Sequence, residues 1–329
     1  MSVDNILIII AAVFLLVLGH ELSHFISGII FKFSVKSLSV LFLEVEIRDG
    51  RLYFKFKKSL KNFAIGMCYC YPNEKTTYWQ YVFFRGAGIL FDAIVFIIMT
   101  GIMLFTDAYN SKQFILAYII CLFGFIYNFI PLSSPTLTDM YILWSAITNK
   151  VFIQDLLNLA YIAGAYEYGI RPRLISNKHY IVKSTNLREI NSELYTHYLY
   201  MLILFLLDSN EHNVFYDDFR RIIKENESEI IEKNIPEYKA LYMIYLIHVE
   251  KDYDRALELW ESIKDTAEKS IESLIAELMV NYVTNQDNEY LKAKLLKELN
   301  FDKEKGAFYT FEDLIKIYTL NNSRIAGHR

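Results

Sequence analysis

Cysteine and proline are scarce in this sequence, which has three Cys and five Pro among its 329 residues. Three cysteines do not support a disulfide framework, and Cys68 and Cys70, spaced Cys-x-Cys without a second pair, are a poor signature of a zinc site. With Cys121, which lies in an apolar run, we interpret them as reduced thiols without a catalytic role. A basic stripe with interleaved aromatic residues is also missing, so we expect no nucleic-acid partner.

The composition is more apolar than that of an ordinary soluble protein. Apolar residues make up 53% of the chain and aromatic residues 16%, whereas soluble domains average about 45–50% apolar with glycine counted. This excludes a disordered chain. The formal net charge of −4 conceals an asymmetry, because residues 1–150 hold 12 Lys+Arg against 9 Asp+Glu while residues 151–329 hold 22 against 29.

The apolar excess lies in three runs of the first half of the chain, which predict membrane spans at about residues 5–31, 86–105 and 114–131. Each run is close to or longer than the roughly 20 residues that a helix needs to cross a bilayer. The first run is not typical of a signal peptide, because Asp4 precedes it without a Lys or Arg and no small-residue cleavage site follows. Later apolar stretches, such as residues 198–207, are too short to span a membrane.

The loop between the first two runs predicts the orientation. Residues 32–85 hold ten Lys+Arg against four acidic residues, and such loops lie on the cytoplasmic side of membranes. We therefore expect the N-terminus outside and the domain after the third span in the cytoplasm.

Two patterns predict structure outside the membrane. Within residues 44–57, alternating side chains flank Asp49-Gly50, which is typical of a β-hairpin. From about Asp155 onward, acidic amphipathic segments with few Gly or Pro predict helices. Residues 251–265, with Ala256 as a small packing residue, read like the second helix of a tetratricopeptide unit, although no full 34-residue period is evident.

A cluster of polar residues interrupts the first apolar run. His20-Glu21-Leu22-Ser23-His24 is an H-E-x-x-H motif, and within lipid the backbone must be helical. Histidines at i and i+4 share a face and can bind one Zn²⁺, while Glu21 can reach a water as general base. Ionisable residues in a membrane segment are costly and functional by default; polar contacts that hold helices together are the alternative.

A catalytic zinc requires a third protein ligand and an open position for water. Asp107 lies at the far end of the second span. Asp92 lies about 10 Å below the cytoplasmic face, at the depth of the histidines. A straight helix would carry Asp139 about 37 Å, out of the hydrocarbon core, but Pro131 and Pro135 break that helix, and an irregular segment can fold back where protein covers it. Geometry alone leaves both Asp92 and Asp139 open.

The order of these motifs resembles the site-2 protease-type intramembrane zinc metalloproteases. Residues 19–24 match the GHExxH motif, residues 44–57 the β segment that faces the cytoplasm, residues 87–92 loosely an A-G-P-x-x-N-like stretch, and residues 128–131 the N-x-x-P motif. The resemblance covers about residues 1–150. The sequence departs from the family at Ile89, where the family has Pro, and at Met140, where Gly follows the ligand Asp.

The resemblance implies a zinc endopeptidase of a bacterial cell membrane. It implies a set of functional residues: His20, His24 and Asp139 as Zn²⁺ ligands, Glu21 as the catalytic base and Asn128 as a polar group near the substrate carbonyl. On this basis we predict Asp139 as the third ligand, with Asp92 as the alternative.

The predicted fold is an α-helical integral membrane protein, with a three-span metalloprotease core at residues 1–150 and an all-α, tetratricopeptide-like soluble domain at residues 151–329. The predicted reaction is hydrolysis of a peptide bond in a membrane segment or hydrophobic peptide precursor. A substrate could add a strand to the hairpin, which makes Val45, Ile47 and Phe54 candidate substrate-binding residues; a hairpin that only packs at the membrane interface is the alternative. The expected partners are this substrate, the lipid bilayer and a protein that binds the helical domain. A non-catalytic scaffold, in which a degenerate protease core anchors the helical domain, is the alternative function.

Overall fold

The computed structural model describes residues 3–48, 51–56, 66–133, 137–184, 187–209, 213–232, 235–264, 270–284, 291, 294–295 and 306–320. The chain forms two compact units. The first unit comprises Met1–Gly164 with Lys183–Asn191, and the second Ala165–Val182 with Ser192–Arg329.

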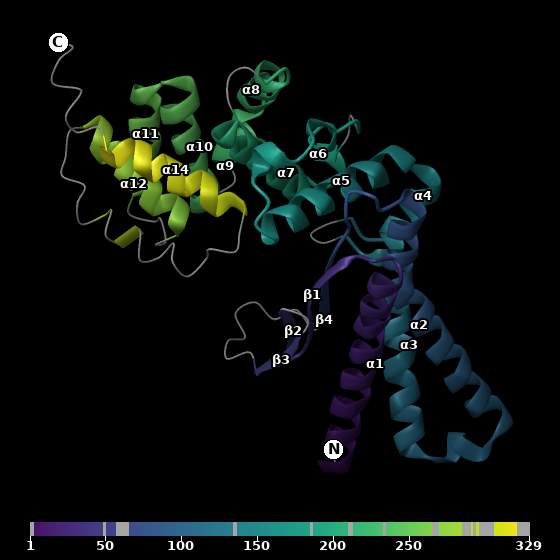
Figure 1. The fold of residues 1–329 in the computed structure, drawn as a ribbon. Coiled ribbons are helices and arrows are strands. Elements are labelled where there is room, and N and C mark those ends of the chain that lie inside the picture. Colours follow the sequence, from purple (N-terminus) through teal and green to yellow (C-terminus); the bar gives the residue numbers. More distant parts are fainter. Residues whose placement is uncertain are drawn as a thin grey trace, which may run out of the picture. The chain divides into compact units, whose positions relative to one another are not determined.

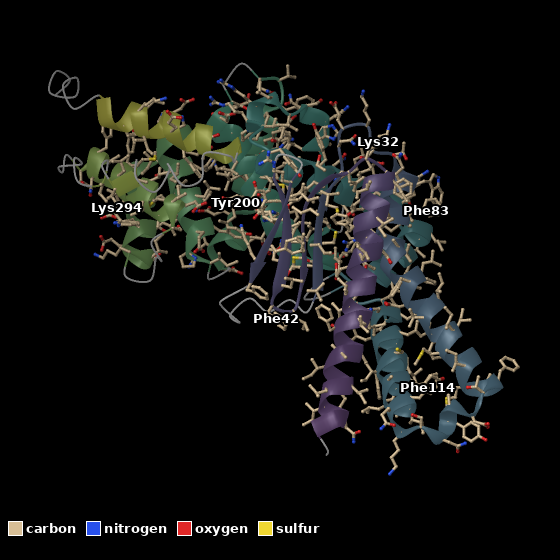
Figure 2. All side chains as sticks on the ribbon, turned by 60° about the horizontal axis from the view of Figure 1, so that its bottom comes forward. Lys32, Phe42, Phe83, Phe114, Tyr200 and Lys294 are labelled. Atoms are coloured by element: carbon tan, nitrogen blue, oxygen red, sulfur yellow. The ribbon has the colours of Figure 1, made fainter. Side chains whose placement is uncertain are left out.

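Three long helices of the first unit lie side by side: α1 (Val3–Ile30), α2 (Tyr78–Phe105) and α3 (Lys112–Phe129) (Figure 1). A short helix η1 (Asp107–Asn110) joins α2 to α3. All three long helices are long and apolar enough to cross a membrane, so the three predicted apolar helices are confirmed. In Figure 2, Lys32 and Phe114 mark the two opposite ends of this helix group.

Local chemistry explains where these helices begin and end. Lys32 stops α1 by adopting a left-handed backbone conformation, with φ of 59°. The predicted span 86–105 starts too late, because Thr77 and Gln80 form a capping box that begins α2 at Tyr78. The predicted span 114–131 ends too late, because a residue before proline avoids the helical region and Ile130 before Pro131 is extended.

A four-stranded antiparallel sheet lies beside α1. Its strands are β1 (Ser34–Val40), β2 (Leu43–Arg48), β3 (Arg51–Phe56) and β4 (Gly66–Tyr71), in the spatial order β3-β2-β1-β4. The predicted hairpin is confirmed as β2 and β3, whose register pairs Val45 with Phe54. The turn residues Asp49 and Gly50 lie outside the described residues.

The sheet contains two strands beyond the predicted hairpin, and these are the strands that contact α1. The pairings Phe54–Val45, Val45–Leu38 and Leu38–Cys68 form one row across all four strands. Directly paired residues of an antiparallel sheet share a face. Exposure along this row rises from buried Leu38 to Phe54, which is 68% exposed on the edge strand β3.

The first unit continues with α4 (Asp139–Thr148), most of α5 (Lys150–Glu167) and α6 (Leu187–Ile190). The Thr138 side chain caps the start of α4 by accepting a hydrogen bond from the Tyr141 backbone. Helix α4 packs on the first turns of α2, where the Tyr78 hydroxyl donates to the Ala146 carbonyl at 2.7 Å. Asp139 therefore lies at the start of a separate helix and not in an extension of α3.

The second unit is helical in the part that the structure describes, and its core is built from fully buried residues such as Leu199, Phe205 and Ile244. Its longer helices are α7 (Ser192–Asp208), α8 (Tyr216–Glu225), α10 (Pro236–Tyr245), α11 (Tyr253–Ile263), α12 (Ile271–Val283) and α14 (Gly306–Leu320). Shorter elements are η2 (Pro172–Leu174), η3 (Asn177–His179), α9 (Glu227–Glu232) and η4 (Leu246–Glu250).

The predicted helix at residues 251–265 corresponds to α11, and Ala256 within it is completely buried. The all-helical prediction for this region is confirmed for the described residues. The lengths of the helices vary from 6 residues in α9 to 17 in α7. The tetratricopeptide-like interpretation gains no support from them.

Candidate metal centre

Three side chains from two helices converge within the first unit. His20 and His24, one turn apart on α1, bring their Nε2 atoms to 3.3 Å from each other. Asp139, the first residue of α4, places Oδ2 at 2.9 Å from His24 Nε2 and 3.4 Å from His20 Nε2. The three residues thus present one nitrogen or oxygen atom each to a common point.

The opposite ring nitrogens of both histidines are already engaged. His20 Nδ1 lies 2.8 Å from Asp92 Oδ2, and His24 Nδ1 lies 2.8 Å from the Phe84 carbonyl oxygen. A carbonyl and a carboxylate accept hydrogen bonds, so each Nδ1 carries the proton and donates it. In neutral imidazoles the Nε2 lone pairs then face Asp139 Oδ2, which is the arrangement that metal-binding histidines adopt.

This arrangement fits a zinc ion. Three acceptor atoms that lie 2.9–3.4 Å from one another repel unless a proton or a cation lies among them. Tetrahedral coordination with bonds of about 2.0–2.1 Å separates ligand atoms by about 3.3–3.4 Å. Two of the three separations in the structure are 3.3 and 3.4 Å, and the third is 2.9 Å. Two imidazoles and one carboxylate are also a donor set that catalytic zinc uses.

Close packing against α2 holds the imidazoles in place. A Cβ atom added at Gly88 would lie 2.4 Å from His20 Nε2 and 2.7 Å from His24 Nε2. Only glycine leaves room for both rings at this position. His24 is 5% exposed and Asp92 1% exposed, so the centre is shielded from solvent by protein.

Arg85 of α2 completes the surroundings of Asp139. An Nη2 nitrogen of Arg85 lies 3.1 Å from Asp139 Oδ1, the carboxylate oxygen that does not face the histidines. Burial by itself raises the pKa of Asp139, and the charge of Arg85 is the largest influence that opposes burial and holds this pKa below its ordinary value. Asp139 is therefore ionised and able to bind a cation.

Glu21 lies beside the three converging residues without belonging to them. Its carboxylate lies against the start of β4, where a Cβ atom added at Gly66 would come within 2.6 Å of Glu21 Oε1. Cys68 and Cys70 follow on the same strand with their sulfur atoms 3.3 Å apart. Hydrogen bonding to Cys70 and burial raise the pKa of the Cys68 thiol, so it is protonated at neutral pH.

Asp92 and Asn128 lie behind His20. The Asn128 side-chain amide donates to Asp92 Oδ2 at 2.7 Å, and Asp92 Oδ2 accepts from His20 Nδ1. Asp92, the alternative third ligand, therefore contacts the ring nitrogen that faces away from Asp139. The role of Asn128 beside a substrate carbonyl stays a prediction, because in this structure its amide donates a hydrogen bond to Asp92.

The candidate substrate-binding residues lie on the outer strands of the sheet. Val45 and Ile47 are half-buried on β2, and Phe54 is exposed on β3. Gly66 of β4 packs against Glu21, and the sequence pattern did not predict this strand. Val45, Ile47 and Phe54 thus belong to the part of the sheet that extends away from α1.

Sequence reasoning also missed Arg85, Gly88 and the Phe84 carbonyl. A signal for them exists in the helical period of α2. Residues spaced by three or four positions, from Tyr81 through Phe84, Arg85 and Gly88 to Asp92, form the face of α2 that contacts α1 and α4. That face carries the charged side chains of a helix that is otherwise apolar.

Comparison of the chain with protein-family models, with curated proteins and with solved structures finds no match. The resemblance to site-2 proteases remains a prediction from the motifs. The convergence of His20, His24 and Asp139 is seen in the structure and does not depend on that resemblance.

Proposed function

We propose that this protein is a membrane-embedded zinc endopeptidase that hydrolyses a peptide bond in a membrane segment or a hydrophobic peptide precursor. The observation that carries the proposal is the convergence of His20 Nε2, His24 Nε2 and Asp139 Oδ2, with both Nδ1 atoms engaged on the far sides of the rings. Glu21, adjacent to His20 on the same helix, supplies the acid–base group that such a centre needs.

The charges of the cluster favour a divalent cation. Three carboxylates (Glu21, Asp92 and Asp139) and the guanidinium of Arg85 give the group a formal charge of −2 when both imidazoles are neutral. A cation of charge +2 neutralises this group, which matters because uncompensated charge is costly in a buried or membrane environment. The two imidazole nitrogens favour Zn²⁺ over Mg²⁺ or Ca²⁺, which prefer oxygen ligands.

Several side chains of the protein have separate roles in the proposed hydrolysis. Bound Zn²⁺ supplies Lewis acidity, which lowers the pKa of water toward 7 and polarises a peptide carbonyl. Glu21 takes the proton of the attacking water and passes it to the leaving amine. Asp92 keeps His20 in the tautomer that leaves Nε2 free. Asn128 donates one amide hydrogen to Asp92 and so supports this orientation, and the second hydrogen of the same amide is the donor proposed for a substrate carbonyl.

Three apolar helices support a membrane location. The basic loop between α1 and α2 supports a cytoplasmic position for the sheet and for residues 151–329. Single cysteines at Ser59 and Asn110, in a chain without its three natural cysteines, test this orientation; Ser59 lies outside the described residues. We expect an impermeant thiol reagent to label Asn110→Cys from outside the cell and Ser59→Cys only after lysis, and the reverse result would invert the topology.

The exposed edge of the sheet supports an extended substrate. A scissile bond must be extended to be attacked, and an edge strand can pair with such a segment through its unpaired backbone groups. Among the described residues, strand β3 pairs with β2 alone, and it carries Phe54 and Phe56, which are 68% and 70% exposed. The helical second unit is suited to bind a substrate or regulatory protein, and a tetratricopeptide-like role there is part of this proposal.

Cleavage by the full-length protein in lipid vesicles tests the proposal. Glu21→Gln keeps a similar shape and removes the base, so we expect it to retain zinc and to lose cleavage by about 10²–10⁴-fold. His20→Ala should lose both zinc and cleavage. Glu261→Gln, the same change at an exposed position of α11, is the matched control and should match wild type. Zinc without cleavage in any of these proteins would favour the non-catalytic scaffold.

A further inference from the structure

Arg85 is a charged residue in an unusual place. The 28 residues of α2 contain two charged side chains, Arg85 and Asp92, in a helix that is apolar enough to cross a membrane. An arginine at such a position is costly and is retained where it has a specific partner. In the proposed hydrolysis Asp92 orients His20, and Arg85 has no role.

The partner of Arg85 is Asp139, whose two carboxylate oxygens face different groups. Asp139 Oδ1 faces Arg85 Nη2 at 3.1 Å, whereas Oδ2 faces His24 Nε2 at 2.9 Å and His20 Nε2 at 3.4 Å. A carboxylate left free beside a zinc ion can bind through one oxygen or through both. The guanidinium competes for Oδ1, because charge-assisted hydrogen bonds between Arg and a carboxylate are strong and directional.

We propose that Arg85 is a positioning residue that holds Asp139 as a one-oxygen metal ligand. With Oδ1 on Arg85, the protein supplies three ligand atoms and a fourth position remains open for water, which a catalytic site requires. If both oxygens bound the metal, that position would be filled by the ligand itself. This inference rests on the proposed zinc site, and it assigns a role that the ligand set alone does not require.

Other contacts keep α4 on α2 when Arg85 is changed. The Tyr78 hydroxyl donates to the Ala146 carbonyl at 2.7 Å, and a Cβ atom at Gly86 would lie 3.1 Å from Leu143, so the helices are closely packed there. Replacing Arg85 should therefore leave Asp139 near the histidines and free its Oδ1. Arg85→Met removes the charge and keeps an unbranched side chain, and Arg85→Lys keeps the charge without the planar guanidinium.

The test uses the full-length protein in detergent and two measurements that do not depend on cleavage. Zinc affinity is measured by competition with a chelator, and the visible absorption of the Co²⁺-substituted protein reports coordination number, since tetrahedral Co²⁺ absorbs more strongly than five- or six-coordinate Co²⁺. For Arg85→Met we expect zinc affinity about 10–100-fold weaker than wild type, the range typical of partners behind a ligand. Its cobalt absorption should also fall.

Two further variants complete the experiment: Arg85→Lys, and a control that removes a cation far from the site. We expect Arg85→Lys to bind zinc about three- to tenfold more weakly than wild type, because one ammonium replaces the directional guanidinium. Lys112→Met removes a cation at the exposed start of α3, at the Phe114 end of the helix group, and should leave both measurements unchanged (Figure 2). Circular dichroism verifies that each variant is folded.

The inference is overturned if folded Arg85→Met binds zinc as tightly as wild type and keeps the wild-type cobalt spectrum. If Arg85→Met does not fold, Arg85→Lys decides, and unchanged affinity and spectrum in that variant overturn the inference. A wild-type protein that binds no zinc is a different result. It overturns the proposed function, and this inference with it.

Discussion

Asp92 and Asp139 contact opposite nitrogens of the same imidazole: Asp92 Oδ2 lies 2.8 Å from His20 Nδ1, and Asp139 Oδ2 lies 3.4 Å from His20 Nε2. In the proposed zinc site, Asp139 is therefore a ligand and Asp92 orients the ligand His20. This arrangement predicts that Asp139→Ala loses zinc almost completely, because a ligand atom is removed. Asp92→Ala should weaken zinc binding by about 10–100-fold, the usual cost of losing a partner behind a ligand.

Zinc content and chelator competition on the two purified variants measure this ranking. A protein in which Asp92→Ala alone empties the site, while Asp139→Ala keeps zinc, would reverse the assignment of the third ligand. Asp92→Asn is a useful third variant. Its amide oxygen still accepts from His20 Nδ1, so we expect zinc affinity between those of wild type and Asp92→Ala.

Gly88 predicts a steric effect on the same centre. Any side chain at this position would lie within 2.4 Å of the His20 ring and displace both imidazoles. We therefore expect Gly88→Ala to lose most of its zinc while its helix content stays as in wild type. Gly101→Ala is the matched control, because it lies on the same helix and has no heavy atom within 4 Å of an added Cβ.

Atomic absorption and circular dichroism on both alanine variants test this prediction. Retention of full zinc by Gly88→Ala would mean that the imidazoles do not pack against α2 as described. Loss of zinc by Gly101→Ala as well would point to a general effect of glycine replacement in α2.

The edge strand predicts a separation between cleavage and metal binding. Phe54→Pro removes a backbone donor from β3, so pairing with an extended substrate should weaken and cleavage should fall while zinc content stays near one per chain. Phe54→Ala keeps the backbone N–H and should cost less activity. Val45→Pro lies on β2 between two partner strands, so it should disturb the sheet more. Parallel loss of zinc and cleavage in Phe54→Pro would instead indicate misfolding.

Much of the first unit could be predicted because its signals are local. Three apolar runs and an Asp-Gly turn between alternating segments identify helices and a hairpin from neighbouring residues alone. Strands β1 and β4 were missed for physical reasons. A register shift between Val35 and Ser37 interrupts the alternation of β1, and the Cys and Tyr side chains of Met67–Tyr71 alternate in size without alternating in polarity.

In the candidate site, too, residues with a local signal could be predicted and the others could not. His20 and His24 could be identified from the sequence, because a spacing of four residues places them on one helix face. Asp139 lies 115 residues from His24 along the chain, and its position depends on the end of α3 at Phe129 and on the packing of α4 against α2. Arg85 and Gly88 could not be assigned, because their roles depend on which helix faces them.

The second unit allows a pH prediction. His248 Nδ1 lies 3.2 Å from the Tyr318 hydroxyl, and burial together with the nearby charge of Lys251 lowers the pKa of His248 to about 4. The ordinary value in the unfolded chain is about 6.5. Between these values the unfolded state binds the proton more readily, so stability is full above about pH 6.5 and is lost as the pH falls toward 4.

We expect this histidine to account for a loss of about 3 kcal/mol between pH 7 and pH 4. Denaturant unfolding followed by the fluorescence of Trp260, with Trp79 and Trp144 replaced by Phe, measures the free energy of unfolding of this unit. His248→Gln can still hydrogen-bond Tyr318 but does not titrate, so its stability should depend less on pH. An equally steep pH dependence in His248→Gln would contradict the assignment.

X-ray absorption at the zinc edge tests the central claim most directly, because it reports the atoms around the metal in the full-length protein. For the proposed site we expect one zinc per chain with two imidazoles and only nitrogen or oxygen neighbours, at about 2.0–2.1 Å. His24→Ala should abolish this signal. A protein without zinc, or zinc with a sulfur neighbour at about 2.3 Å from Cys68 or Cys70, would contradict the assignment of His20, His24 and Asp139 as its ligands.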